Sequence, residues 1–290
     1  MRNNKKIAII GLLLLSIIWG SNIPFMKSAL VFSGPAEFSF LRNFFGSLVL
    51  FALLALLKKP ILVKEAPKLI ILGIFQTAGF TGFLVWALVE GGASKTAILV
   101  FTMPLWVSMM AWPLLKEKLS TAQWIASGIC FIGIVMIINP LGLSSNILSS
   151  YLALASGFSW ACGVILSKKI HFKYPKLDLL TMTAWQMLWG SIPLFLILFV
   201  TTSGPIIWSN HFIGIVIFNV LFVNAIAYLL WFYALKHLTA SLVSILSLLT
   251  PITGALSAWF LFNETSSSTE ILGYILILLG LFTLLFFQKK

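Results

Sequence analysis

Long apolar runs separated by short polar gaps dominate the chain. Ten stretches of predominantly apolar residues are each long enough to cross the hydrocarbon core of a bilayer as a helix, which takes about 20 residues. They cover residues 7–26, 36–57, 69–89, 96–115, 121–139, 149–169, 178–201, 211–235, 239–262 and 270–287. The runs are continuous and do not alternate, which favours helices over a β-barrel. We therefore expect an all-α integral membrane protein with ten transmembrane helices.

The gaps between the runs are too short to hold a soluble domain. The clearest are Lys58–Lys68, Pro140–Leu148 and Thr202–Asn210. Composition agrees, because 60% of the residues are hydrophobic and 9% are charged, whereas soluble domains carry about 25% charged residues. A basic segment, Met1–Lys6, precedes the first run, but no small-residue cleavage site follows it. We interpret this run as a retained span, not a signal peptide.

The net charge of +12 is concentrated in the gaps. With ten spans both termini lie on one side of the membrane, and 16 of the 19 Lys and Arg residues fall on that side. The exceptions are Lys27, Lys95 and Arg42. By the positive-inside rule, this distribution predicts a multi-pass protein of the inner membrane with both termini in the cytoplasm. Because the basic residues form no stripe on one face, nucleic acid is not an expected partner.

The two halves of the chain match each other. A shift of 147 residues places Ser94–Ser120 on Ser241–Ser267 with nine identities in 27 positions. The pairs that apolar composition does not explain are Pro104/Pro251, Trp112/Trp259 and Glu117/Glu264, and small gaps add Trp19/Trp160 and Lys27/Lys168. We expect two five-helix repeats, residues 1–141 and 148–290. Because five is odd, the repeats are inverted, which is typical of alternating-access transporters with a site at the repeat interface.

Several short motifs carry a likeness to a known family. They are Trp19–Asn22 through Lys27, Arg42, Pro104, Lys116–Leu119, Gln123–Trp124, Asn263–Thr265 and Gly273 through Gly280. On these residues the chain resembles the drug/metabolite transporter superfamily, EamA type, although Lys116 stands where that family often has Gly. The resemblance implies movement of metabolites, often export of amino acids or related compounds. Relatives of this type also include transporters that take up a cofactor such as S-adenosylmethionine.

The residues give little support to an enzyme. Cys130 and Cys162 both lie inside apolar runs without metal-ligand spacing, and no His/Asp/Glu cluster or phosphate-binding glycine loop is present. We therefore expect no catalytic residues, no metal site and no cofactor. The expected partners are a small-molecule substrate and membrane lipid, with the chain a monomer or homodimer. The alternative from a different class is a non-transporting membrane protein that flips or senses lipid.

Polar side chains inside the spans are the candidate functional residues, because burying them in a membrane is costly. Arg42 is the charged residue well inside a run, and it is a candidate for attracting an anionic group or closing an outer gate. The alternative is that its side chain extends to the membrane surface or satisfies helix carbonyls. Gln186 matches Arg42 through the Gly46/Gly190 pair, so it is either a related gate element or a partner in interhelical hydrogen bonding.

A substrate path is expected between the halves, lined by spans three, four, eight and nine. Asn224, Tyr228 and Trp231 share one helical face near the middle of span eight. Gln76 and Phe80 lie in span three. A midplane amide beside aromatic rings suits an uncharged or zwitterionic substrate, although lipid contact or packing is the alternative for each ring. Pro104 and Pro251 predict paired bends that act as hinges, with a static kink as the alternative.

Overall fold

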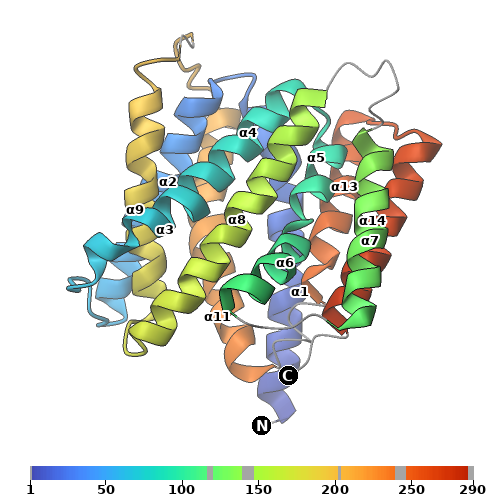
Figure 1. Ribbon diagram of the computed structural model, residues 1–290. Helices are drawn as coiled ribbons and strands as arrows, with labels where there is room; N and C mark the ends of the chain where they lie inside the picture. The colour runs from blue at the N-terminus through green and yellow to red at the C-terminus, as the bar shows by residue number, and fades with distance from the viewer. Residues whose placement is uncertain (1, 116–119, 139–146, 202–203, 239–245, 287–290) are drawn as a thin grey trace.

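The computed structural model describes residues 2–115, 120–138, 147–201, 204–238 and 246–286. Within these ranges the chain forms helices and connecting turns and contains no β-strand (Figure 1). The all-α prediction is therefore confirmed for the described part of the chain. The start of α1 and the end of α14 lie at the same end of the helix bundle (Figure 1), which we call the terminal end; the opposite end is the distal end.

The helices follow the apolar runs closely. The first half of the chain contains α1 (Arg2–Ala29), α2 (Pro35–Leu56), η1 (Ala66–Leu69), α3 (Ile70–Gly73), η2 (Ile74–Gly79), α4 (Phe80–Glu90), α5 (Ala93–Val100), α6 (Met103–Leu115) and α7 (Thr121–Ile138). The second half contains α8 (Ile147–Lys173), α9 (Leu179–Ile197), α10 (Asn210–Phe218), η3 (Asn219–Ile226), α11 (Ala227–His237), α13 (Leu249–Phe262) and α14 (Ser268–Phe286).

Among the residues that the structure describes, eight helical stretches are long and apolar enough to cross a membrane. They are Asn4–Ala29, Pro35–Leu56, Ala66–Glu90, Ala93–Ala111, Thr121–Ile138, Ile147–Lys173, Leu179–Ile197 and Asn210–Trp231, and two shorter apolar helices, Leu249–Phe262 and Ser268–Leu284, follow them. The first eight predicted runs agree with these stretches to within a few residues. The start of the ninth run, residues 239–245, lies outside the described residues.

The outer surface of the bundle is apolar. Ile10, Leu196 and Leu279 are each more than half exposed, and such a surface is unfavourable in water but not against lipid tails. Many polar side chains point inward and are satisfied by helix carbonyls; for example, Asn43 Nδ2 donates to Ser39 O at 2.8 Å. This inside-out distribution is that of a multi-pass membrane protein.

Helices of the first half pack mainly against helices of the second. The most extensive contacts join α7 to α14, α2 to α9, α1 to α13 and α4 to α8. Further contacts join α1 to α11 and α8 to both α5 and α6. These pairs recur when each helix is replaced by the one five spans away. The contact of span one with span nine (α1 with α13) corresponds to that of span six with span four (α8 with α6). The contact of span three with span six (α4 with α8) corresponds to that of span eight with span one (α11 with α1).

Glycines allow α7 and α14 to approach closely. A Cβ atom built on Gly133 would lie 2.7 Å from Gly273 O, and one built on Gly273 would lie 2.8 Å from Gly133 O. Cys130 is buried in the same interface, with its Sγ 3.7 Å from Ile277 O. This contact between the halves has no room for a side chain at either glycine, so it is a packing interface.

Spans four and nine are interrupted next to the matched prolines. The break between α5 and α6 falls at Phe101–Thr102, just before Pro104. In the second half, a turn at Leu248 precedes α13, which contains Pro251. A proline cannot donate a hydrogen bond to the carbonyl four residues earlier, here Val100 in span four. That carbonyl packs against α8, where a Cβ atom on Gly157 would lie 2.7 Å from it.

Spans three and eight each contain a π-helical segment that the sequence analysis did not predict. η2 widens span three over Ile74–Gly79, and η3 widens span eight over Asn219–Ile226. π turns inside α-helices are rare and occur frequently at functional sites. Gln76 lies in η2 and Asn224 lies in η3, so both candidate amides of the middle spans belong to these segments.

Candidate functional site

A small central cavity of about 80 Å³ lies between the two halves of the chain. Its wall is formed by α1, α2, α4, the interrupted stretch Val100–Met103, α8, η3 and α11. The first half supplies most of the lining, and the second half contributes Trp160, Val223, Asn224 and Tyr228. Because both halves contribute to one wall, a relative movement of the halves would change the size of this space.

The cavity-facing side of α1 follows helical spacing. Trp19, Asn22, Ile23 and Met26 line the cavity at intervals of three and four residues, which places them on one face of the helix. Trp19 is fixed by its indole N–H, which donates to Val223 O at 3.2 Å. The same bond joins α1 to η3 across the two halves.

Two pairs of aromatic rings contribute to the cavity wall. The rings of Phe80 and Trp160 are 4.7 Å apart between centroids. The rings of Trp19 and Tyr228 are 5.9 Å apart and meet edge to face. Aromatic pairs of this kind provide a large apolar surface together with polar edges, so the cavity suits a ligand with both apolar and polar parts.

Arg42 lies inside the cavity wall and does not reach the membrane surface, since its side chain is 5% exposed. Its Nη1 contacts Met26 Sδ, and its Nε has no hydrogen-bond partner among the described residues. The backbone carbonyl of Arg42 accepts a hydrogen bond from Asn224 Nδ2 at 2.8 Å. α2 and η3 are therefore joined at the same point where the guanidinium group borders the cavity.

The structure brings together four of the residues singled out from the sequence. Phe80, Asn224, Tyr228 and Arg42 all line the central cavity. Trp231 lies beside it, with its ring 5.9 Å from that of Trp19. The first four converge on one cavity from α2, α4, η3 and α11. The roles of all five in binding or gating remain predictions.

Four other candidates lie away from the cavity lining. Gln76 accepts a hydrogen bond from Ser167 Oγ of α8 at 3.1 Å through its Oε1. Gln186 is buried in α9, with no partner for its Oε1 within the described ranges. Pro104 follows the lining residue Met103, and Pro251 is buried in α13. The gate role of Gln186 and the hinge roles of the prolines remain predictions.

The lining differs from the expectation that spans three, four, eight and nine would form it. Spans three, four and eight do contribute. Spans one, two and six, which are α1, α2 and α8, contribute as well, and α13 of span nine supplies none of the lining residues in the described part of the chain. Sequence reasoning therefore missed Trp19, Asn22 and Trp160. The available signal was the matched pair Trp19/Trp160 in the repeat, together with an amide at Asn22 inside an apolar run.

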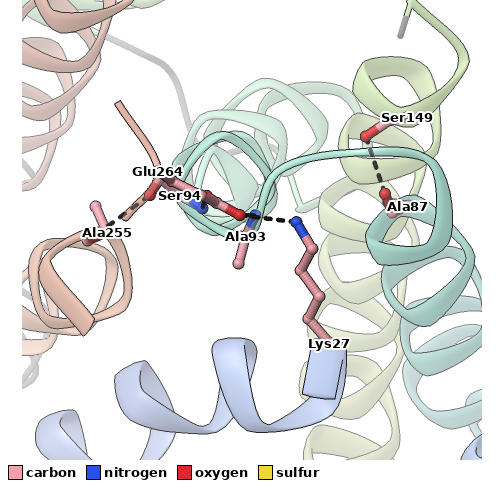
Figure 2. Close-up of polar contacts among 7 residues, drawn as sticks. All are labelled: Lys27, Ala87, Ala93, Ser94, Ser149, Ala255 and Glu264. Atoms are coloured by element: carbon pink, nitrogen blue, oxygen red, sulfur yellow. Dashed lines mark hydrogen bonds and ion pairs between the residues drawn. The ribbon is translucent and has the colours of Figure 1, made fainter. Parts of the chain in front are cut away.

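A polar cluster at the distal end links the two halves (Figure 2). Glu264, in the connection between α13 and α14, pairs with Lys27 Nζ of α1 at 2.7 Å. It also accepts hydrogen bonds from the backbone N–H groups of Ala93 and Ser94, each at 2.9 Å. We call these four residues the distal cluster. Figure 2 shows the Glu264 carboxylate between Lys27 and the first turn of α5.

The surroundings of Glu264 favour its ionised form. Partial burial alone would raise the pKa of this carboxyl, but hydrogen bonds from Lys27, Ser94 and Ala93 outweigh burial and lower the pKa below its ordinary value. The N-terminus of α5 adds a favourable dipole. The cluster therefore stays charged and intact near neutral pH.

The position of the distal cluster relates it to the cavity. Lys27 directly follows the lining residue Met26 on α1, and Ser94 Oγ donates to Ala255 O of α13 at 3.3 Å. The cluster therefore ties α1, α5 and α13 together, and α1 and α5 both also contribute residues to the cavity lining. In the described residues no group of His, Cys, Asp and Glu could hold a metal ion.

Comparison with known proteins identifies the family. The sequence model of the EamA-like transporter family matches residues 6–139 and matches again over residues 147–286. The chain belongs to the EamA-like transporter family. Its family and the names of its relatives are those of transporters, not enzymes, and a small-molecule substrate follows from membership.

Individual relatives of this EamA protein are distant but cover nearly its whole length. An uncharacterised transporter of Bacillus subtilis is 26% identical over 97% of this chain and 98% of its own. A protein of Salmonella typhimurium named a probable amino-acid metabolite efflux pump is 29% identical, covering 93% and 92% of the two chains. An S-adenosylmethionine uptake transporter of Rickettsia prowazekii is 25% identical over 88% and 84%.

A solved crystal structure shares the fold. Its chain is 17% identical and superimposes with a TM-score of 0.68, covering 98% of this chain and 99% of that one. At this identity the likeness concerns the fold alone. It extends through the whole helix bundle, including the parts on which the cavity and the distal cluster are built.

Proposed function

We propose that this protein exports amino acids or related small metabolites across the inner membrane by alternating access. In this proposal ten spans form two inverted repeats, residues 1–141 and 148–290, and both termini lie in the cytoplasm. The observation that carries the proposal is the central cavity, whose wall takes Trp19 and Arg42 from one half and Trp160 and Asn224 from the other. A site shared by two halves is the arrangement that alternating access requires.

Three features support the inverted repeats. The helix pairs between the halves recur after a shift of five spans, as α1 with α13 and α8 with α6 illustrate. α13 and α14 are apolar and pack on spanning helices, which supports a ninth and a tenth crossing. The 16 Lys and Arg residues assigned to the terminal end, against 3 elsewhere, support a cytoplasmic position for that end.

The small size of the cavity supports a closed state that must open to admit a substrate. Its volume of about 80 Å³ is far below the roughly 300–1,000 Å³ of typical ligand sites. We therefore interpret the structure as a state in which the space is closed at the distal end by the cluster around Glu264. Opening requires the halves to separate, and the interruptions beside Pro104 and Pro251 are the places where spans four and nine can bend.

The chemistry of the wall favours small amphipathic substrates. Aromatic rings provide apolar contact, and Arg42, Asn22 and Asn224 provide a few polar groups. A polyanion such as a sugar phosphate would need several basic side chains, whereas the described part of the lining contains one basic residue, Arg42. The relative named a probable amino-acid metabolite efflux pump supports amino acids as the substrate class.

Counterflow in proteoliposomes tests the proposal. The purified protein is reconstituted with unlabelled amino acid inside, and entry of a panel of radiolabelled amino acids is compared with movement of fluorescent lipid between the leaflets. We expect accumulation of labelled amino acid and no lipid movement above protein-free vesicles. Lipid movement without counterflow would instead support a lipid-flipping protein. Asn224→Ala should impair counterflow while the variant remains monodisperse in detergent.

A second candidate is uptake of S-adenosylmethionine, which is supported by the Rickettsia prowazekii relative of that name. The aromatic rings around the cavity are able to contact a sulfonium cation. Against it, Arg42 places a positive charge in the same wall. Counterflow of radiolabelled S-adenosylmethionine in the same vesicles separates the two candidates, because only one of the two labels is expected to accumulate.

A further inference from the structure

Two buried polar atoms in the cavity wall lack partners. Asn22 Oδ1 and Arg42 Nε are both shielded from solvent and neither makes a hydrogen bond to any residue that the structure describes. Asn22 is 3% exposed and Arg42 is 5% exposed. Most buried polar groups in proteins are satisfied, so two unsatisfied groups on residues that line one cavity indicate a place where a polar ligand can bind.

Arg42 presents an uncompensated positive charge. The ion pairs among the described residues, Lys27–Glu264 and Lys59–Asp178, do not involve it. Its Nη1 contacts the thioether of Met26, which is a weak acceptor. A buried cation without an anion is strongly unfavourable, and a guanidinium group binds a carboxylate through two parallel hydrogen bonds. The Arg42 side of the cavity is therefore suited to a carboxylate.

Asn22 presents the complementary group. Its Oδ1 accepts hydrogen bonds but cannot donate them, and the residue Asn22 lines the same cavity from α1. An ammonium group carries three donors, so it satisfies this oxygen without needing a buried carboxylate. The rest of the wall is mostly apolar or aromatic, as at Trp19, Phe80 and Trp160.

We propose that Arg42 and Asn22 recognise the two charged ends of a free α-amino acid, with the carboxylate on Arg42 and the ammonium group on Asn22. This assignment rests on the proposed function and deepens it. The aromatic wall then faces the side chain and favours an apolar one. A carboxylic acid without the ammonium group leaves Asn22 unpaired, and an amine without the carboxylate leaves Arg42 unpaired, so both analogues bind more weakly than the amino acid.

The test measures competition in counterflow. Uptake of radiolabelled L-leucine and L-phenylalanine is inhibited with the matching deaminated acids, 4-methylpentanoate and 3-phenylpropanoate, and the matching amines, isoamylamine and 2-phenylethylamine. For the wild type we expect each analogue to inhibit at least about tenfold more weakly than the parent amino acid, because a buried polar group is left unpaired.

The variants assign each charged end to its residue. Arg42→Gln should abolish the preference for the amino acid over the amine, and Asn22→Leu should abolish the preference over the deaminated acid. Arg42→Lys keeps the charge, so it should bind the amino acid more weakly but still prefer it to the amine. This variant tests the assignment if Arg42→Gln does not fold. Asn219→Leu is the matched control, because Asn219 is also buried with an unpaired Oδ1 but does not line the cavity.

The outcomes separate this inference from the proposed function. Loss of discrimination in the two cavity variants, with Asn219→Leu unchanged, supports the assignment. Wild-type counterflow with discrimination unaltered in folded Arg42 and Asn22 variants overturns the assignment and leaves amino acid export standing. Counterflow of other amino acids but of neither leucine nor phenylalanine also overturns it. Absence of counterflow for every amino acid in the panel overturns both.

Discussion

The two ends of the bundle each contain a lysine–carboxylate pair between the halves, yet the pairs are built differently. Lys27 and Glu264 are 2.7 Å apart at the distal end, and Lys59 and Asp178 are 2.8 Å apart at the terminal end. The side chains of the first pair are 29% and 18% exposed, and those of the second are 38% and 31% exposed. Distance and exposure alone would give both pairs a similar role.

The remaining hydrogen bonds of the two carboxylates differ. Asp178 caps its own helix, since its Oδ1 accepts from the N–H groups of Leu180 and Thr181 at the start of α9. Glu264 caps a helix of the other half, α5, through Ala93 and Ser94. Breaking the Asp178 contacts therefore weakens the start of α9 together with one ion pair, whereas breaking the Glu264 contacts removes an ion pair and two backbone hydrogen bonds that all join the halves.

The largest effect is expected for Glu264→Ala. This change removes the ion pair and both backbone contacts. The closed distal end should therefore be destabilised by roughly 2 kcal/mol relative to the open one, which shifts the equilibrium toward the open state by a factor of about 30. The variant Ile23→Cys, in a background that lacks the partly exposed Cys162 and keeps the buried Cys130, should react correspondingly faster with a water-soluble thiol reagent. Asp178→Ala is the matched control and should leave the rate unchanged; equal acceleration in both would contradict the comparison.

A smaller effect is expected for Lys27→Met. The cation is lost, but Glu264 keeps its bonds to Ala93 and Ser94. The closed distal end should therefore be destabilised by about 1 kcal/mol, and the thiol reaction should become roughly fivefold faster. Lys27→Arg keeps the charge and should react close to the wild-type rate. If Lys27→Met matched Glu264→Ala in rate, the backbone contacts would contribute nothing to closure.

Asp178→Ala is expected to lower the thermal stability of the protein without opening the distal end. Loss of an N-cap side chain costs about 1 kcal/mol, so the melting temperature in detergent should fall by a few degrees. Thermal unfolding followed by tryptophan fluorescence measures this change. Lys59→Met, which leaves the cap in place, should lower the melting temperature less than Asp178→Ala does.

The smallest effect is expected from mild acidification. Because the pKa of Glu264 is lowered in the folded protein, its contribution is fully present above the ordinary carboxyl pKa of about 4.3 and is lost only as pH falls through the lower folded value. Spin labels at the exposed positions Val31 and Ser267 should therefore report the same distance distribution from pH 7 to pH 5. A change within that window would show that a group other than Glu264, such as His211 beside Ser28 of α1, also acts on the distal end.

The apolar pattern was sufficient to predict most helices, because lipid demands long apolar runs with internally bonded backbones. The matched residues Lys27/Lys168 and Glu117/Glu264 also marked special positions in the repeat. They did not indicate that Lys27 and Glu264 meet, because 237 residues separate them and only the packing of α1 on α13 brings them close. Glu117 lies outside the described residues.

The candidate site was predicted in part. Helical spacing correctly associated Asn224 with Tyr228 in the cavity wall. It did not separate cavity residues from packed ones, because Gln76 bonds to Ser167 of α8 and Trp231 packs on Trp19. Sequence spacing gives the direction of a side chain around its own helix, but the neighbouring helix determines whether that direction leads to open space.

The number of residues in a π-helical segment determines the direction in which the side chains after it face. An α-helix turns by about 100° per residue, and the wide turn of η3 lies within Asn219–Ile226, just before Tyr228. Deleting one residue from this segment would rotate everything after it by about 100° relative to α10. Tyr228 and Trp231 would then face lipid or a different helix, although their sequence and their depth in the membrane would hardly change. The direction in which Tyr228 and Trp231 face is thus set by the number of residues in η3.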